Sequence, residues 1–318
     1  MDRLEAMSVL VAAVETGSLS AAGRKLGMPL PTVSRKLSEL EAHLHTRLLN
    51  RTTRSLTLTD SGSAYVEASR RILDEVGNAE RSAAGEYSEP RGHLAVTAPI
   101  VFGRLHVLPV VAEFLAKFPQ IDVRLRLSDR YVHLIDEQVD VAIRIGQLSD
   151  SGLVATRVGA VRYVICANPG YLEKHGAPKT PADLSTRDCI TFDDAATATV
   201  WTFAARGGRK MVQSVQIRSR LSVNNAEAAI DAAIAGVGIT RVLSYQAAEA
   251  VSRGRLKIVL GAFKNEPLPV NLVHAGQGLL PLKIRALLEF AAPQIRRRLA
   301  ALPTALQSRA PDKPGRTR

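Results

Sequence analysis

Two short helical patterns joined by a tight turn constrain the fold of this chain more than any other stretch. Ser18 precedes and Gly27 follows eight residues of helix-forming sequence, the usual capping arrangement of a short helix. In the next segment, residues 29–44, four apolar side chains recur at i, i+4, i+7 and i+11 and therefore share one helical face. These side chains are Val33, Leu37, Leu40 and Leu44. The spacing predicts a second helix whose apolar face packs against the rest of a small domain.

The opposite face of this second helix is polar. Arg35 points almost directly away from the apolar face, with Pro31, Thr32 and Ser38 beside it. Before the pair of helices, Leu4, Met7, Val11 and Val14 mark one face of a first helix. Three helices of this kind, the last presenting a cation and hydroxyl groups, are typical of a helix-turn-helix domain that places one helix in the DNA major groove. DNA is therefore the first partner to test.

A β-wing is predicted directly after the second of these two helices. Leu56 and Leu58 alternate with threonines, which is the period of a half-buried strand. The preceding residues carry arginines separated by small polar residues, among them Arg51 and Arg54. Arginines on a wing beside a recognition helix are well placed to reach phosphates or the minor groove.

The first 62 residues resemble the LysR-type bacterial transcriptional regulators. The matching residues, in the order and spacing of that family, are Ser20-Ala21-Ala22, Leu26-Gly27, Val33-Ser34-Arg35, Leu40-Glu41, Leu44, Arg47-Leu48-Leu49, Arg51-Thr52-Thr53-Arg54 and Leu58-Thr59-Asp60-Ser61-Gly62. The resemblance implies major-groove contacts by Pro31, Thr32, Ser34 and Arg35 and wing contacts by Arg51 and Arg54. The chain departs from the family at Pro29-Leu30, where Ser-Gln is frequent, because leucine cannot form the hydrogen bonds of glutamine to a base edge.

The net charge of +12 is a weak argument for DNA binding because of its distribution. Seven basic residues and one acidic residue from position 296 onwards supply half of the excess. The proline- and arginine-containing end of the chain, residues 302–318, is predicted to be a disordered basic tail. The argument for DNA therefore depends on where the cations lie in the first 60 residues.

A long helix from residue 60 to about residue 84 is expected to form the dimer contact. Apolar or small residues recur there at alternating spacings of four and three, namely Tyr65, Ser69, Ile72, Val76, Ala79 and Ala83. The same pattern also fits one face of an ordinary globular helix. A homodimer is favoured because a two-fold DNA site needs a two-fold protein, and the family resemblance extends this to a homotetramer. Residues 85–92 are predicted to be a hinge.

Strands and helices alternate beyond the hinge. Strands are expected at 94–98, 121–127, 139–145 and 162–166, with a helix over 101–118 and a short one over 131–136. This rhythm predicts parallel sheets covered by helices. The family resemblance also covers TAP at Thr97 to Pro99, DVAIRIG at Asp140 to Gly146 and AGVGI at Ala235 to Ile239. It implies the two-lobed α/β fold of periplasmic solute-binding proteins, in which strand 270–274 and a last helix from Pro281 return to the first lobe.

The resulting domain prediction has four parts. Residues 1–60 form a winged helix-turn-helix domain, and residues 61–89 form the dimerising helix and hinge. Residues 90–301 form a two-lobed effector domain, with lobe one at 90–161 and 268–301 and lobe two at 162–267. The tail follows. Pro293 should interrupt or end the last helix.

An effector site is expected where strands end and helices begin, since free N–H groups there attract anions. Thr97 and Ile100 stand at such a point in the first lobe, and Asn224 and Asn225 in the second. Thr97 and Asn225 could equally cap their own helices. Two further strand-end candidates, Asp129 and Arg144, could instead be surface charges. The predicted ligand is a small organic effector, for which the helix starts favour an anion, and no cofactor or metal is expected.

Other functional classes find little support in the residues. There is no phosphate loop, no G-x-S-x-G elbow and no third glycine beside Gly236 and Gly238. Cys166 and Cys189 lie in apolar runs and are expected to be buried, reduced thiols. Apolar runs are too short for a membrane span and no signal peptide is evident, so a cytoplasmic location is expected. A regulator of transcription, with RNA polymerase as a candidate partner, is favoured. The alternatives are a two-lobed ligand-binding protein or enzyme with a helical extension, and a nonspecific DNA-binding protein.

Overall fold

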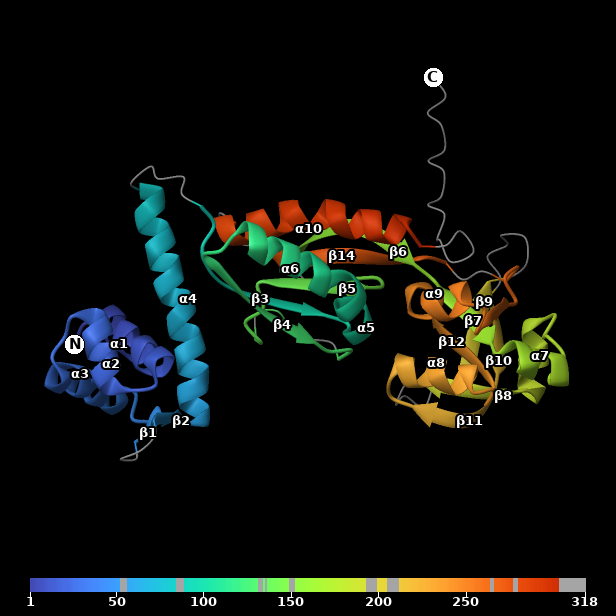
Figure 1. Ribbon diagram of the computed structural model, residues 1–318, viewed down its shortest axis with the longest axis horizontal. Coiled ribbons are helices and arrows are strands. Elements are labelled where there is room, and N and C mark those ends of the chain that lie inside the picture. The colour runs from blue at the N-terminus through green and yellow to red at the C-terminus, as the bar shows by residue number, and fades with distance from the viewer. Residues whose placement is uncertain are drawn as a thin grey trace, which may run out of the picture. The chain divides into compact units, whose positions relative to one another are not determined.

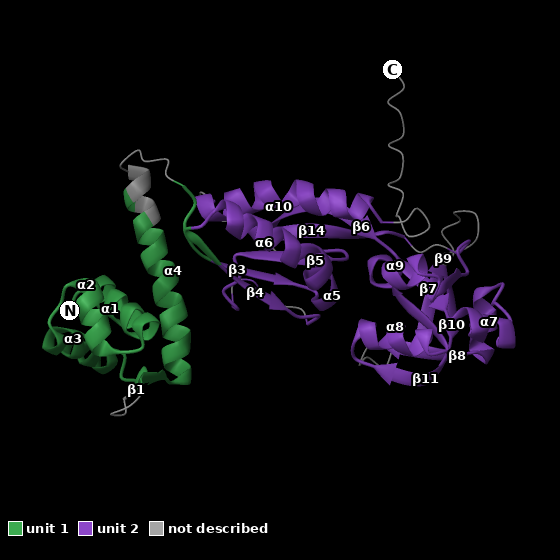
Figure 2. Ribbon diagram, viewed as in Figure 1, with its two compact units in different colours: residues 1–93, 120–122 green, residues 94–119, 123–318 purple. Residues whose placement is uncertain are grey.

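The fold was analysed in a computed structural model, which describes residues 1–51, 56–83, 89–130, 134, 136–148, 152–192, 199–204, 212–263, 266–276 and 280–302. The chain divides into two compact units (Figure 2). The first unit comprises residues 1–93 and 120–122, and the second comprises residues 94–119 and 123–318.

The first unit is a three-helix domain with a two-stranded wing and a long helix. Its elements are α1 (Arg3–Thr16), α2 (Leu19–Leu26), α3 (Leu30–His43), β1 (Leu49–Arg51), β2 (Leu56–Leu58) and α4 (Asp60–Ala83). β1 and β2 pair antiparallel, with Leu49 opposite Leu58. The fold class predicted for this part of the chain, a winged helix-turn-helix with a long helix after it, is confirmed.

The predicted turn between α2 and α3 is confirmed in detail. The Ser18 side chain accepts a hydrogen bond from the Ala21 N–H at 3.1 Å and caps α2. Gly27 ends α2 with φ at 65°, a left-handed conformation that glycine adopts without a Cβ clash. Pro29 precedes α3 and Pro31 lies in its first turn, where a missing N–H costs nothing.

The buried face of α1 differs from the predicted one. Leu4 is exposed, and Met7, Val11 and Val14 are only half-buried, whereas small residues and two larger ones fill the core. The fully buried residues of α1 are Ala6, Val9, Leu10, Ala12 and Ala13. Because α1 packs against α2, α3 and α4, its buried surface is broader than the predicted face and includes three alanines beside Val9 and Leu10.

The predicted seam of α4 is partly used within the protomer. Tyr65 packs against the helix-turn-helix core, and Ser69 is fully buried. Ile72 is exposed, and the side chains of Ala79 and Ala83 lie outside the described residues. The predicted dimer seam is therefore wrong for its first two positions, which are buried within the protomer, where α4 packs against α1.

The second unit contains two lobes, each built on a five-stranded sheet (Figure 1). The first lobe has the strand order β4-β3-β5-β14-β6, and α6 and α10 cover one face of this sheet. Its elements are β3 (Gly92–Ala98), α5 (Ile100–Phe102), the π-helical turn η1 (Gly103–Val107), α6 (Leu108–Lys117), β4 (Ile121–Leu127), β5 (Val141–Ile145), β6 (Leu153–Val161), β14 (Leu268–Ala275) and α10 (Leu282–Ala300).

The second lobe has the strand order β11-β8-β12-β7-β13. Its elements are β7 (Tyr163–Ala167), α7 (Pro169–His175), the 3-10 turn η2 (Pro181–Thr186), β8 (Asp188–Phe192), β9 (Val200–Ala204), β10 (Val212–Gln216), β11 (Arg218–Val223), α8 (Ala226–Ile234), β12 (Ile239–Leu243), α9 (Ser244–Ser252) and β13 (Lys257–Val259). A separate antiparallel pair, β9 and β10, carries Trp201 and Phe203 into the core. The two-lobed α/β prediction is confirmed.

The sheets are mixed, which corrects the prediction of parallel sheets. β3 pairs parallel with β5, but β14 pairs antiparallel with both β5 and β6. In the second lobe β8 pairs parallel with β11 and β12, whereas β7 is antiparallel to β12 and β13. Antiparallel strands arise where the chain passes from one lobe to the other instead of through a crossover helix. β6 was not predicted as a strand, because its mixed sequence lacks a clear period.

One prediction near the end of the chain is wrong. Pro293 neither interrupts nor ends α10, which runs on to Ala300. Pro293 itself is exposed, while Leu287, Ile295 and Leu299 bury the opposite side of the helix and hold it in place. Residues 303–318, in which most of the basic tail falls, lie outside the described residues, as does most of the predicted short helix at 131–136; its described residues form turns.

The two cysteines are buried and unpaired with each other, as predicted. Burial raises the pKa of each thiol to about 12. Among the residues that the structure describes, no helix is both long enough and apolar enough to cross a bilayer.

Candidate nucleic-acid interface and effector junction

The packing of α3 fixes which of its faces is free. Val33, Leu37 and Leu40 are completely buried against the other helices of the first unit. Arg35 and Pro31 are exposed, as the helical period predicts. Because the apolar face is anchored by three fully buried side chains, the polar face is held at a defined orientation and can enter a groove as a rigid surface.

The front of α3 carries the remaining predicted base contacts. Thr32 and Ser34 are half-buried, and each keeps a hydroxyl group near the start of the helix. Leu30, the first residue of the helix, is 46 % exposed. The N-terminal turn of α3 therefore presents one large apolar side chain beside two hydroxyl groups.

Arg35 is held by an acidic neighbour that was not predicted. Its Nη1 lies 2.7 Å from Oε1 of Glu39, one helical turn further on. The side chains are 63 % and 39 % exposed, so water screens much of this attraction. The i,i+4 spacing of Arg35 and Glu39 is the sequence signal that could have revealed it. The pair restrains the guanidinium before DNA binds, and DNA must compete with Glu39 for it.

The wing is fastened to α3 and α4 by side-chain hydrogen bonds. Oε1 of Glu41 accepts the N–H groups of Leu48 at 2.8 Å and Leu49 at 3.1 Å. The Thr59 hydroxyl donates to the Arg47 carbonyl at 2.8 Å. Gly62 lies so close to the Leu48 carbonyl that a Cβ atom there would approach its oxygen to 2.0 Å, which requires glycine at this position.

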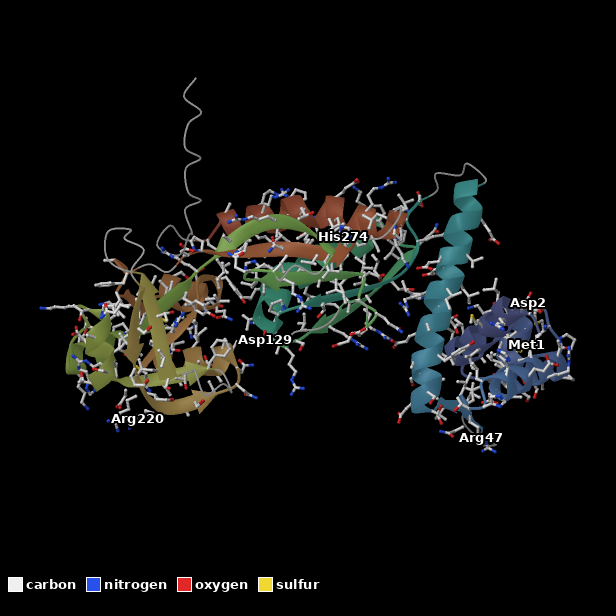
Figure 3. The ribbon with its side chains drawn as sticks, turned by 180° about the vertical axis from the view of Figure 1, so that it is seen from behind. Met1, Asp2, Arg47, Asp129, Arg220 and His274 are labelled. Atoms are coloured by element: carbon white, nitrogen blue, oxygen red, sulfur yellow. The ribbon has the colours of Figure 1, made fainter. Side chains whose placement is uncertain are left out.

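The two predicted wing arginines are described only in part. Arg51 ends β1 and pairs with Leu56, although its side chain lies outside the described residues. Arg54 lies in residues 52–55, also outside them. Arg47 is exposed at the start of the wing (Figure 3).

The predicted effector residues of the first lobe take different roles. Asp129 follows β4, and its Oδ1 accepts the Ile100 N–H at 3.0 Å (Figure 3). The start of α5 is thus already occupied by a carboxylate of the protein. Thr97 is buried within β3 and does not cap α5, which Pro99 precedes without a side-chain cap. Arg144 is half-buried on β5.

In the second lobe, Asn225 caps α8. Its Oδ1 accepts the N–H groups of Glu227 at 2.7 Å and Ala228 at 3.3 Å, which confirms the capping interpretation. Asn224 is exposed beside it. Glu227, in the first turn of α8, forms an ion pair with Arg104 of the π-helical turn in the first lobe. Arg104 and Glu227 connect the lobes, and neither was predicted because they are 123 residues apart.

Aromatic side chains also connect the lobes. Phe102 and His106 lie 5.2 and 5.6 Å from the ring of Tyr245 at the start of α9, both in edge-to-face geometry. His106 is 9 % exposed, and its Nε2 has no hydrogen-bond partner among the described residues. Burial, and then the positive charge of Arg298, lowers the pKa of His106 to about 4. A neutral imidazole therefore packs at this junction at neutral pH.

Comparisons with known proteins agree with both halves of the chain. Residues 4–63 match the family "Bacterial regulatory helix-turn-helix protein, lysR family", and residues 88–296 match the family "LysR substrate binding domain". An uncharacterized HTH-type transcriptional regulator of Haemophilus influenzae is 32 % identical over 285 residues, which cover 89 % of this chain and 98 % of that protein.

Solved structures show the same architecture. CrgA, a LysR-type transcriptional regulator from Neisseria meningitidis, is 30 % identical with a TM-score of 0.58, covering 92 % of this chain and 98 % of that one. AphB, a virulence activator of Vibrio cholerae, is 25 % identical with a TM-score of 0.58, covering 91 % and 98 %. A DNA-binding helix-turn-helix domain followed by an effector-binding domain defines a regulator of transcription. The chain belongs to the LysR-type family of transcriptional regulators.

Proposed function

We propose that this regulator reads a specific DNA sequence through the polar face of α3 and contacts the flanking backbone or minor groove through its wing. The observation that carries this proposal is the exposed Arg35 on a helix whose opposite face is fully buried. Pro31, Thr32 and Ser34 complete the major-groove surface, and Arg51 and Arg54 are the wing contacts. Arginine can form a bidentate contact with guanine, whereas a hydroxyl group can form a hydrogen bond with any of several bases.

The working unit is proposed to be a homodimer, paired into a homotetramer as family members suggest. The part of α4 beyond Ser69 is the proposed dimer contact, since Ile72 is exposed there and the earlier positions are buried within the protomer. Two copies of α3 would then enter major grooves one helical turn or a multiple of it apart.

A small organic effector is proposed to bind where the two lobes meet and to shift the lobes against each other. The proposed contacts are Thr97, Ile100, Asp129, Arg144, Asn224 and Asn225. The carboxylates of Asp129 and Glu227 stand at the starts of α5 and α8 and repel an anion there. An anionic group of the effector is therefore expected beside Arg144, and hydrogen-bonding groups beside Asn224 and Asn225.

The remaining assignments follow from this role. We propose no enzymatic activity, location in the cytoplasm where the DNA partner is, and RNA polymerase as a further partner. The predicted bounds, 1–60, 61–89, 90–301 and 302–318, are proposed as the functional domains.

A mobility-shift assay with the DNA upstream of its own gene tests the DNA-binding proposal. The full-length protein should shift this duplex at moderate salt and resist an excess of random competitor. If no shift appears at dimer-forming concentrations, the alternative of a ligand-binding protein or enzyme with a helical extension is favoured instead. A shift that random DNA abolishes equally would indicate a nonspecific binder.

A thermal-shift screen of small metabolites on the full-length protein tests the effector proposal. A ligand that binds only the folded state raises the melting temperature as its concentration increases. Substituting Asn224 by alanine should weaken that rise without changing the melting temperature of the free protein by more than about a degree, because Asn224 is exposed. An unchanged rise would remove Asn224 from the site.

A further inference from the structure

A short segment at the end of α3 supplies most of the hydrogen bonds to the connection between α3 and the wing, and Thr59 supplies others. The N–H groups of Leu44, His45 and Thr46 bond to the carbonyls of Leu40, Ala42 and Glu41. The next N–H groups of the wing, those of Leu48 and Leu49, bond to the Glu41 carboxylate. Glu41 thus binds this connection through both its main chain and its side chain.

We propose that Glu41 is the positioning residue that sets the distance between the recognition helix and the wing. Leu48 and Leu49 are almost completely buried, so loss of the carboxylate removes the side-chain acceptor of two N–H groups that lie at the edge of the core. Arg51 lies two residues after Leu49 on the same three-residue strand. Fixing the start of β1 to α3 therefore fixes where Arg51 meets DNA relative to Arg35.

Electrostatics alone makes the opposite prediction for Glu41. A carboxylate near the phosphates of DNA repels them, and its removal would strengthen binding to any sequence. A positioning role requires instead that its removal weaken binding. The sign of the change therefore distinguishes the two effects. This inference rests on the proposed DNA contact of Arg51 and extends it to a residue that does not itself touch DNA.

The test compares Glu41→Ala with Glu41→Gln in the full-length protein. The probes are a duplex selected from a random-sequence library with the wild-type protein and a scrambled duplex of equal length. Glutamine keeps an oxygen that can accept both N–H groups but carries no charge. We expect Glu41→Ala to bind both duplexes about tenfold more weakly, and Glu41→Gln to stay within about threefold of wild type or bind more tightly.

A second comparison separates positioning from general loss of the fold. In an Arg51→Ala background, Glu41→Ala should cause less than about a twofold further loss, because the positioned side chain is already gone. In an Arg35→Ala background the loss of about tenfold should persist. Glu41→Ala should also reduce the slope of log affinity against log salt concentration by about the amount expected for one phosphate contact.

Several results would overturn the inference. They are a Glu41→Ala variant that binds as well as wild type or better, a Glu41→Gln variant that loses as much as the alanine variant, and an equal loss with and without Arg51. These results are distinct from failure of the proposed function, in which the wild-type protein would select no duplex.

Discussion

Leu30 is the residue at which this recognition helix departs from the LysR-type pattern, and the structure makes the departure consequential. A leucine with almost half of its surface exposed, at the first position of α3, faces outward beside hydroxyl groups. A side chain without a donor or acceptor can discriminate bases only by shape and apolar contact, and the thymine methyl group is the apolar feature of the major groove.

We predict that Leu30 contacts a thymine methyl group. Replacing one thymine of the selected duplex by deoxyuridine removes only that methyl group, and at the contacted position it should weaken wild-type binding about three- to tenfold. Leu30→Ala should bind the thymine and deoxyuridine duplexes equally. If deoxyuridine at every thymine position leaves wild-type affinity unchanged, Leu30 does not read this group.

His106 gives the stability of the protein a pH dependence. Its pKa is about 4 in the folded protein and about 6.5 when unfolded, so the unfolded chain binds the proton more strongly. Stability is therefore fully retained above about pH 6.5 and falls as the pH decreases towards 4, by about 3 kcal/mol at most. His106→Gln should lose this part of the slope between pH 6.5 and 4.5 in denaturant titrations. An identical slope in both proteins would contradict the assignment.

At the scale of residues, the sequence predicted correctly those features that depend on helical periodicity. It did not predict those that depend on contacts between residues far apart in the chain. The exposure of Arg35 and the burial of Val33 and Leu37 follow from the helical period alone. The role of Glu41 could not be predicted, because the N–H groups it binds become its neighbours only when the wing folds back. Capping by Asn225 was one of the two roles that the sequence left open for this residue, and it could be anticipated because capping is local.

At the scale of elements, α10 shows how packing overrides a local rule. Proline inside a helix removes one hydrogen bond and crowds the preceding turn, at a cost of about 3 kcal/mol. Helix α10 nevertheless continues through Pro293, because its buried side packs against β6 and α6. Leu299 lies over Gly159, where an added Cβ atom would come within 2.4 Å of it.

We predict that Pro293→Ala stabilises the protein by about 1 to 2 kcal/mol. The substitution restores an N–H group and relieves crowding, and it loses little packing because Pro293 is exposed. The gain is reduced by the greater entropy of the unfolded chain without proline. Urea unfolding of both proteins measures the difference. A destabilised variant would show that the proline ring contributes packing.

Elements with clear sequence boundaries were predicted well, and those with mixed composition were not. Strand β4 has the predicted bounds, and α4 begins and ends within a residue of the prediction. Strand β6 was missed, because its pairing with β14 along eight positions, not its own composition, stabilises it. Strand direction likewise depends on how the chain passes between lobes, which local pattern does not encode.

At the scale of the second unit, the two lobes are joined by two chain crossings and by side-chain contacts. The ion pair of Arg104 with Glu227 and the packing of Phe102 and His106 on Tyr245 link the first lobe to α8 and α9 of the second. An effector that changes the lobe geometry must bind with different affinity to the state in which these contacts are formed and to the state in which they are broken.

We predict measurable coupling between Arg104 and Glu227. Charge reversal at either position should destabilise the protein slightly, and the double exchange Arg104→Glu with Glu227→Arg should recover the loss. Because both side chains are partly exposed, the coupling energy should be about 0.5 kcal/mol at low salt and smaller at high salt. Thermal unfolding of the four proteins measures this cycle. Strictly additive effects would mean that the lobes do not meet through this pair in solution.

The most direct test of the DNA-reading role compares Arg35→Ala with Arg51→Ala on the selected and scrambled duplexes across a range of salt concentrations. Arg35→Ala should lose about 1 to 3 kcal/mol on the selected duplex and little on the scrambled one, because a base contact is specific. Arg51→Ala should weaken both and reduce the salt slope by about one. Equal losses of Arg35→Ala on both duplexes would make Arg35 a phosphate contact and contradict the central claim that α3 reads sequence through it.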